Sequence, residues 1–410
     1  MINQRRLRDY PRLMLVTAWA ILAINLLLHQ GWQGLLGQII GSDFIMFYST
    51  GLIYRSHPNL IYDYDEQLRV QQSLIHPTVL PGLNPFMNPP YVAPLYSMLT
   101  SLPLSWAISL WTCLMLLCVV VAVRWMAGFI PPGVRSSGLN FGQLLIIVLS
   151  FFPLIEGLQA GQNHGLTLLL VTALIFFTFS GRGYLAGVAA GLLLYKPQFV
   201  LGFLIIWVVW RQYKALAGFC GVALIWIGSF FISHGYQLFQ DFQQLSQVFL
   251  LLPYIEGFPR YILVTIYGLL TSILPQSFQP AIAWISNGLF ILAAGGLAYL
   301  AYRLRHQPME RRIPALALAL LYPLIATPYT LLHDLLILIP GFVLWARYDS
   351  SHRLMHTAII IYLGAFFLTL AAALTKIALV SMLVICLAVA VIIWLFRHRT
   401  FVFNPQELSE

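Results

Sequence analysis

A lone carboxylate, Asp43, lies where an apolar segment follows a short polar one. It occurs in the sequence Gly-Ser-Asp-Phe, and the next five residues, 44–48, are aromatic or aliphatic. A carboxylate at the surface of an apolar layer is partly desolvated, which raises its pKa and makes it a better proton acceptor. An aspartate here is also a common N-cap for a helix that starts at Phe44. The two roles are compatible, and Asp43 is the candidate general base.

Three more ionisable side chains interrupt apolar sequence further along the chain. Lys196 lies within Gly-Leu-Leu-Leu-Tyr-Lys-Pro-Gln-Phe-Val. A lysine in that setting is costly unless it snorkels to the interface or pairs with an anion such as a lipid phosphate. His333 and Asp334 stand side by side at the start of another apolar run, after the helix-breaking Pro328. This pair can orient a ligand or tune a proton, or it can form a structural hydrogen bond between helices.

A polar turn at residues 156–164 separates two apolar segments. Gln162, Asn163 and His164 fall at the start of the second segment, where side-chain amides can cap a helix. The same side chains can equally hydrogen-bond the hydroxyls of a polyol ligand. We therefore keep both interpretations of this turn.

Asp63-Tyr64-Asp65 has the form of the D-x-D metal motif of nucleotide-sugar transferases. Asp63 and Glu66, however, have the spacing of a capping box, and a helix-like polar stretch follows at once. We expect the capping role, since a divalent cation would need further oxygen ligands. The sequence also lacks a P-loop, a Rossmann glycine fingerprint and an H-E-x-x-H zinc helix. Neither a cofactor nor a metal is expected.

The elements that position these residues are membrane-spanning helices. Charged residues make up 9% of the 410-residue chain and apolar residues 60%, whereas a soluble protein has about 25% charged residues. The net charge of +9 does not indicate nucleic-acid binding, because the basic residues lie in short gaps between apolar runs, where they set orientation. The composition predicts an all-α polytopic membrane protein.

A hydrocarbon core needs about 20 apolar residues per helix, which predicts about twelve spans, within a range of about ten to fourteen. The expected spans lie near residues 13–29, 105–125, 141–157, 164–181, 184–195, 197–210, 214–233, 281–303, 313–326, 330–346, 355–375 and 377–396. All but five of the 22 basic residues then face the cytoplasm, as the positive-inside rule requires. The exceptions are Arg55, Arg69, Lys196, Arg260 and Lys376.

This topology makes residues 1–410 a single transmembrane domain with cytoplasmic ends at 1–12 and 397–410. Residues 30–104 form a first extracytoplasmic loop with interfacial helices, and residues 234–280 form a second large one. Residues 184–210 are expected as two short helices that meet at Lys196-Pro197, with one long helix as the alternative. The glycines at 183, 187 and 191 form a small-residue stripe, for which we expect close helix packing.

Taken together, the motifs resemble those of glycosyltransferase family 87, over roughly residues 10–345. The matching motifs are Asp43-Phe44 with Phe47-Tyr48, Leu60-Ile61-Tyr62-Asp63, Asn88-Pro89-Pro90-Tyr91, Gly161-Gln162-Asn163, Tyr195-Lys196-Pro197 and Pro328 through His333-Asp334. One motif departs from the family, which more often has an aromatic residue before the prolines that precede Tyr91.

The resemblance implies a GT-C fold and an inverting transfer of a sugar from a polyprenyl-phosphate carrier to an acceptor hydroxyl. The sugar is expected to be mannose, because the family resemblance points to mannosyltransferases. It implies the extracytoplasmic face of a bacterial inner membrane, with membrane lipids and a glycolipid or glycan acceptor as partners. Asp43 is the expected base, and Lys196, aided by Arg260, the expected phosphate-binding cation. Expected substrate contacts come from Tyr91, Gln162, Asn163, His164, His333 and Asp334.

Two other classes share this composition. A secondary transporter or lipid flippase is also a basic protein with broken helices, although it is expected to carry an inverted repeat, which the sequence does not show. A non-catalytic scaffold subunit with the same fold has no use for a carboxylate near a phosphate-binding site. Replacement of Asp43 by asparagine would leave such a scaffold unaffected.

Overall fold

The computed structural model describes residues 4–35, 37–136, 139–255, 258–348 and 352–397. Within these ranges the chain is helical, and its β-structure is limited to isolated bridges such as the one between Leu263 and Leu331. The predicted all-α class is therefore confirmed.

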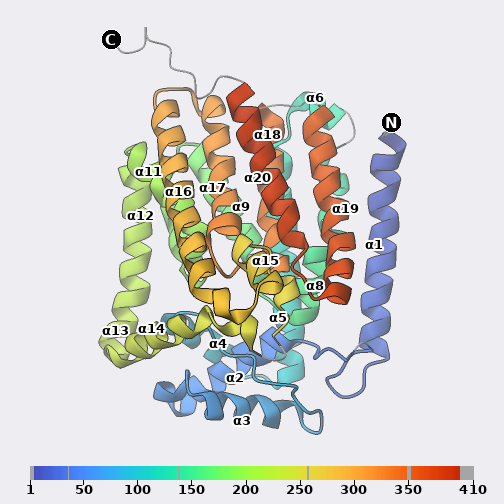
Figure 1. The fold of residues 1–410 in the computed structure, drawn as a ribbon, viewed down its shortest axis with the longest axis vertical. Coiled ribbons are helices and arrows are strands. Elements are labelled where there is room, and N and C mark those ends of the chain that lie inside the picture. The colour runs from blue at the N-terminus through green and yellow to red at the C-terminus, as the bar shows by residue number, and fades with distance from the viewer. Residues whose placement is uncertain (1–3, 36, 137–138, 256–257, 349–351, 398–410) are drawn as a thin grey trace.

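Long apolar helices form a bundle along the longest axis of the molecule (Figure 1). The bundle helices are α1 (Gln4–Leu27), α5 (Leu104–Phe129), α7 (Phe141–Leu149), α8 (Phe152–Ala160), α9 (His164–Phe179), α10 (Gly183–Leu192), α11 (Gln198–Val209), α12 (Tyr213–Ala223), α16 (Gln279–Leu304), α17 (Ile313–Ala326), α18 (Leu338–Tyr348), α19 (His352–Thr375) and α20 (Val380–Arg397). A helix satisfies its own backbone hydrogen bonds, which is the requirement for any segment in lipid.

The remaining helices of the described residues form a second set. These are α2 (Ser42–Ser56), α3 (Tyr64–Ile75), α4 (Ala93–Leu99), α6 (Pro132–Ser136), α13 (Ser229–His234), α14 (Gln237–Phe249) and α15 (Ile266–Ile273). In Figure 1, α2, α3, α4 and α14 lie at the end of the bundle opposite the N-terminus, and α3 and α14 run across the bundle axis. Within the expected first extracytoplasmic loop, residues 89–103 contain the 3₁₀ turn Pro90–Val92 and the short helix α4.

Short helical turns complete the described chain. The 3₁₀ turns are η1 (Pro58–Leu60), η2 (Pro90–Val92), η3 (Leu193–Tyr195), η5 (Leu252–Tyr254), η6 (Arg260–Ile262), η7 (Gln276–Phe278), η8 (Met309–Arg312) and η9 (Leu332–Ile337), and η4 (Leu224–Gly228) is a π-helical turn.

Five helices among the described residues are long and apolar enough to cross a membrane, and a bent pair makes a sixth candidate. They are Asp9–Leu27, Leu104–Phe129, Tyr213–His234, Gln276–Leu304 and Met355–Thr375, and the bent pair is Phe141–Leu149 with Phe152–Ala160. Four further apolar helices are shorter. The chain is thus a membrane protein with several spans, and the count of twelve stays a prediction.

Two expected spans differ in detail from the observed helices. The span expected at 141–157 bends by 57° between α7 and α8, because Pro153 lacks the N–H that a continuous helix would need there. The span expected at 330–346 begins with the 3₁₀ turn η9 rather than an α-helix. By contrast, the helix break predicted at Lys196-Pro197 is confirmed, since α10 and η3 end before it and α11 begins after it.

The glycine stripe packs α10 against α12, as predicted. A Cβ atom added at Gly187 would lie 2.0 Å from the carbonyl oxygen of Ala215. One added at Gly191 would lie 2.5 Å from Cβ of Val222. Only residues without a side chain let the two backbones approach so closely, which is the usual basis of helix packing in membranes.

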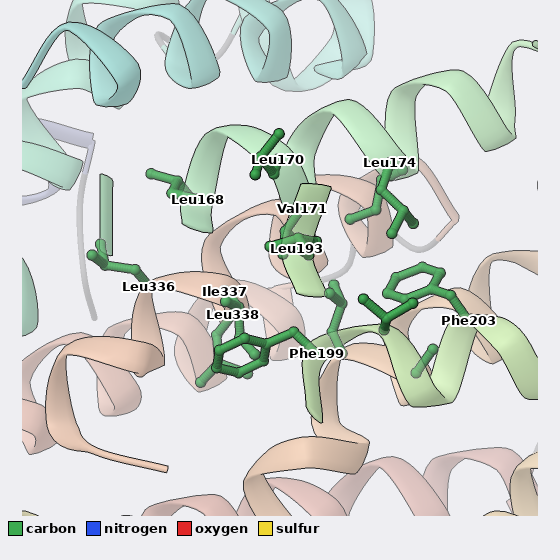
Figure 2. Close-up of a cluster of buried hydrophobic side chains, with 14 of the residues drawn as sticks. Leu168, Leu170, Val171, Leu174, Leu193, Phe199, Phe203, Leu336, Ile337 and Leu338 are labelled. Carbon is green, nitrogen blue, oxygen red and sulfur yellow. The ribbon is translucent and has the colours of Figure 1, made fainter. Parts of the chain in front are cut away.

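A buried apolar cluster joins the elements that precede and follow Lys196 and His333 (Figure 2). Its labelled members are Leu168, Leu170, Val171 and Leu174 of α9, Leu193 of η3, Phe199 and Phe203 of α11, Leu336 and Ile337 of η9, and Leu338 of α18. In lipid such contacts stabilise the fold mainly through close packing. The cluster fixes the turn that carries Lys196 relative to the turn that carries His333 and Asp334.

Candidate active site

Asp43 lies in the first turn of α2, which is not one of the candidate spanning helices. The N-cap of α2 is Gly41, whose positive φ of 68° suits a glycine, and no side chain caps this helix end. The interpretation of Asp43 as an N-cap is therefore wrong. Its position in the first turn still favours a negative charge, because the backbone N–H groups there carry partial positive charge.

Both carboxylate oxygens of Asp43 accept a hydrogen bond from a side-chain amide. Nδ2 of Asn84 donates to Oδ1 at 2.7 Å, and Nε2 of Gln162 donates to Oδ2 at 2.7 Å. Asn84 is held in turn by the buried Gln71 of α3, whose Nε2 donates to the Asn84 carbonyl oxygen at 2.8 Å. The first-loop helix α3 therefore positions one of the two donors to Asp43.

The second donor, Gln162, is positioned by the turn between α8 and α9. Gly161 ends α8 with a φ of 74°, and a Cβ atom there would lie 2.5 Å from Cβ of Phe44. The N–H of Gly41 donates to the carbonyl oxygen of Gln159 at 2.8 Å. These contacts hold the start of α2 against the α8–α9 turn, so that Asp43 faces Gln162.

Burial raises the pKa of the Asp43 carboxyl above its ordinary value of 3.8, because desolvation disfavours the charged form. The charge of His333 and the hydrogen bonds from Asn84 and Gln162 act in the opposite direction without cancelling this effect. The carboxyl thus combines a higher basicity than an exposed aspartate with a fixed orientation. These are the properties of a general base.

Lys196 is paired with a carboxylate of the protein. Its Nζ donates to Oδ1 of Asp334 at 2.8 Å, and the two side chains are only 11% and 4% exposed. The second oxygen of Asp334 accepts a hydrogen bond from the backbone N–H of Leu331 at 3.0 Å. The lysine that the sequence places in apolar surroundings therefore pairs with an anion, one of the two expected solutions.

His333 extends this pair toward α8. Its Nδ1 lies 3.2 Å from Oε2 of Glu156, and its Nε2 lies 3.7 Å from Oδ1 of Asp334. Glu156, His333, Asp334 and Lys196 thus form a continuous series of charged and polar groups, which we call the outer network. A structural bond between helical elements, one of the two roles considered for His333 and Asp334, is present, since Asp334 contacts the turn before α11 and His333 contacts α8.

Asn163 and His164 are buried at the start of α9, each with 1% of its surface exposed. Asn163 occupies the N-cap position, but its side chain does not cap the helix, and its Nδ2 donates to the hydroxyl of Tyr96 at 3.4 Å. The ring of His164 lies 6.3 Å from the ring of His333. The capping interpretation of Asn163 is therefore wrong; both residues are buried, and His164 lies beside His333 of the outer network.

The last two expected site residues lie at different distances from the outer network. The hydroxyl of Tyr91 donates to the carbonyl oxygen of Leu194 at 3.0 Å, which places Tyr91 against the turn that carries Lys196. Nη1 of Arg260 donates to the carbonyl oxygen of Thr271 at 3.4 Å. The structure does not bring Arg260 into contact with the outer network.

Asp63 is a helix cap, as expected. It is the N-cap of α3, and its Oδ1 accepts a hydrogen bond from the N–H of Glu66 at 2.8 Å. The Glu66 side chain does not return this bond and instead accepts from Arg69 at 2.6 and 2.8 Å. In the part of the chain that the structure describes, no three His, Cys, Asp or Glu side chains are grouped to hold a metal ion.

Two polar residues of this site were not singled out from the sequence, Asn84 and Glu156. Asn84 lies in an irregular segment 41 residues from Asp43, and no local spacing indicates their hydrogen bond. Glu156 opens the polar turn at 156–164, where the sequence alone favours the amides that follow it. An acidic residue at the end of an apolar segment was the available signal.

In a comparison with known protein families, the profile of glycosyltransferase family 87 matches residues 86–328. No curated protein and no solved structure matches the chain significantly. The matched range includes Tyr91, Gln162 and Lys196 but stops short of Asp43 on one side and His333 on the other. It covers more than half of the sequence, and the chain therefore belongs to glycosyltransferase family 87.

Proposed function

We propose that this glycosyltransferase moves a sugar, mannose by the family resemblance, from a polyprenyl-phosphate carrier to a hydroxyl of a glycolipid or glycan. The transfer takes place at the extracytoplasmic face of a bacterial inner membrane and inverts the anomeric carbon. The observation that carries this proposal is the environment of the Asp43 carboxylate. The group is partly buried, its pKa is raised, and two amide donors fix its orientation.

In this mechanism Asp43 accepts the proton of the acceptor hydroxyl while that oxygen attacks the anomeric carbon. The bond from the anomeric carbon to the carrier phosphate breaks, and its electron pair leaves with the phosphate. Asn84 and Gln162 each use one carboxylate oxygen of Asp43, and each oxygen keeps a further lone pair for the incoming proton. The amides thus hold the base without blocking it.

Lys196 would stabilise the charge that grows on the departing phosphate. Its ammonium group has three N–H donors, and Asp334 takes one of them in the structure. No other described residue accepts a hydrogen bond from Nζ, so its other N–H groups can bind phosphate oxygens. A phosphate leaves without a general acid, so that a single carboxylate suffices for the chemistry, in contrast to the paired carboxylates of glycosidases.

A lipid-linked donor also accounts for the architecture of the chain. The candidate base is carried by α2, which lies with α3, α4 and α14 at one end of a bundle of apolar helices (Figure 1). A polyprenyl chain reaches such a site from within the bilayer. A nucleotide sugar would need phosphate-binding loops, and the sequence has no P-loop or Rossmann fingerprint.

The donor class is tested with purified protein in lipid nanodiscs that contain a membrane lipid extract as acceptor. We expect release of polyprenyl phosphate from polyprenyl-phosphate-mannose and no turnover of GDP-mannose. Turnover of the nucleotide sugar alone would contradict the proposed donor. A protein that releases no carrier from any polyprenyl-phosphate sugar, but moves such lipids between leaflets, would be a transporter.

The raised pKa of Asp43 predicts the pH dependence of the reaction. The base must be deprotonated, so the rate falls as the pH drops through the pKa of Asp43, and this acid limb lies above pH 3.8. Replacement of Gln162 by leucine removes a hydrogen bond that lowers this pKa. We therefore expect the acid limb of Gln162→Leu at a higher pH than that of the wild type, measured as kcat/KM against pH. An unmoved limb would show that Gln162 does not tune the base.

A further inference from the structure

Glu156 is, with His333, one of the two members of the outer network to which the proposed mechanism gives no task. It lies in the middle of α8 and retains 23% of its side-chain surface exposed, while His333, which it contacts, is 1% exposed. An acidic side chain at such a position is costly unless it serves a partner. Its partner in the structure is Nδ1 of His333, at 3.2 Å.

This contact fixes the orientation of the His333 ring. An ionised carboxylate only accepts hydrogen bonds, so Nδ1 must carry the hydrogen and donate it to Glu156. A doubly protonated ring carries a hydrogen on Nε2 as well, and the hydrogen bond at Nδ1 then sets the direction in which Nε2 can donate. Nε2, for which the described residues provide no hydrogen-bond partner, is thereby directed toward Asp334.

The direction of Nε2 matters because it converges with Lys196. Nζ of Lys196 lies 2.8 Å and Nε2 of His333 lies 3.7 Å from the same atom, Oδ1 of Asp334. Oδ1 of Asp334 is thus an anionic oxygen that lies close to both the Lys196 and the His333 side chains. A phosphate oxygen that approaches Lys196 there would come within reach of His333 as well.

We infer that Glu156 is a positioning residue for the carrier phosphate: it holds His333 so that Nε2 and Lys196 converge on one anionic oxygen. The inference rests on the proposed function and assigns Glu156 a role through His333 rather than through direct contact with substrate. The charged and titratable groups around His333 are Glu156 on α8, Asp334 beside it, Lys196 before α11, Asp43 on α2 and His164 on α9.

The direction in which Glu156→Gln changes the affinity for the carrier distinguishes a positioning role from simple charge repulsion. As a bare negative charge near the phosphate, Glu156 would repel it, and Glu156→Gln would bind the carrier more tightly. As a positioning residue it strengthens binding through His333, and Glu156→Gln would bind more weakly. For histidines that bind a metal ion, the residues that orient the ring typically contribute about 10–100-fold to affinity or activity, and we take the same scale here.

The test measures the dissociation constant of polyprenyl monophosphate for the protein in nanodiscs, with Glu156→Gln, His333→Asn and the double variant. We expect Glu156→Gln to weaken binding about 10-fold. On the His333→Asn background the same change should add little, because residues that act as a unit are not additive. Glu310→Gln, an exposed glutamate in η8, is the matched control and should bind as the wild type does.

Tighter or unchanged binding by Glu156→Gln would overturn the inference, and so would effects that multiply in the double variant. Failure of the wild type to bind the carrier would overturn it too. Binding is measured without turnover, so a protein that binds the carrier and shows the non-additive pattern, yet transfers no sugar, would contradict the proposed function alone. An unchanged unfolding temperature of Glu156→Gln separates the effect from loss of the fold.

Discussion

The Asp43→Asn variant is expected to bind the polyprenyl carrier like the wild type and to turn over about 10²–10⁴-fold more slowly. The amide cannot accept the proton of the acceptor hydroxyl, so the loss appears in kcat rather than in KM for the donor. The measurement is initial-rate release of polyprenyl phosphate at saturating donor and acceptor. Full activity of Asp43→Asn would remove Asp43 from the role of base.

The local structure tolerates this change. Asparagine presents one acceptor and one donor where Asp43 presents two acceptors, so either Asn84 or Gln162 must turn its amide to offer an oxygen. Asp43→Glu keeps the charge but moves it by one methylene, and misplacement of a reacting group by about 1 Å can cost about 10²-fold. Asp65→Asn, an exposed aspartate of α3, is the matched control and should be fully active.

Lys196→Met is expected to combine a loss of turnover with a loss of stability. Removal of the cation withdraws the stabilisation of the leaving phosphate, for which about 10²–10³-fold in kcat is typical of a single such donor. It also leaves Asp334, only 4% exposed, without its partner. A buried ion pair that loses one member typically costs about 3–5 kcal/mol. Thermal unfolding is followed by the fluorescence of the 11 tryptophans.

A double variant separates the two effects. Replacing a buried ion pair by apolar side chains of similar volume is often neutral for stability. We therefore expect Lys196→Met with Asp334→Leu to recover the unfolding temperature that Lys196→Met loses, and to remain inactive. Recovery of turnover in the double variant would show that Lys196 serves only the fold. An unfolding temperature that stays low would show that the pair does more than neutralise its own charges.

Local sequence patterns predicted the local structure of this chain well. The break at Lys196-Pro197 follows from the chemistry of proline, and the cap at Asp63 follows from its spacing to Glu66. Close packing of α10 follows from the glycine repeat. Each of these features depends on residues within one or two helical turns of each other, which is the range that sequence spacing reports.

The pairings within the site lie beyond that range. The hydrogen bond from Gln162 to Asp43 joins residues 119 apart, and the Lys196–Asp334 pair joins residues 138 apart. A single sequence shows that Lys196 needs an anionic partner, but it does not show which residue is that partner. Asp43 illustrates the converse, because its spacing suits an N-cap while the actual cap is Gly41. The tertiary contact with the α8–α9 turn decides where that helix begins.

The most direct test of the account is the anomeric configuration and stoichiometry of a single turnover. Purified protein in nanodiscs receives a polyprenyl-phosphate-mannose donor labelled at the anomeric carbon, and the products are analysed by NMR. We expect one polyprenyl phosphate released per sugar transferred, with the anomeric configuration of the product opposite to that of the donor. Retention of configuration would contradict a mechanism in which Asp43 acts as a base, and carrier release without a glycosylated product would contradict the transfer itself.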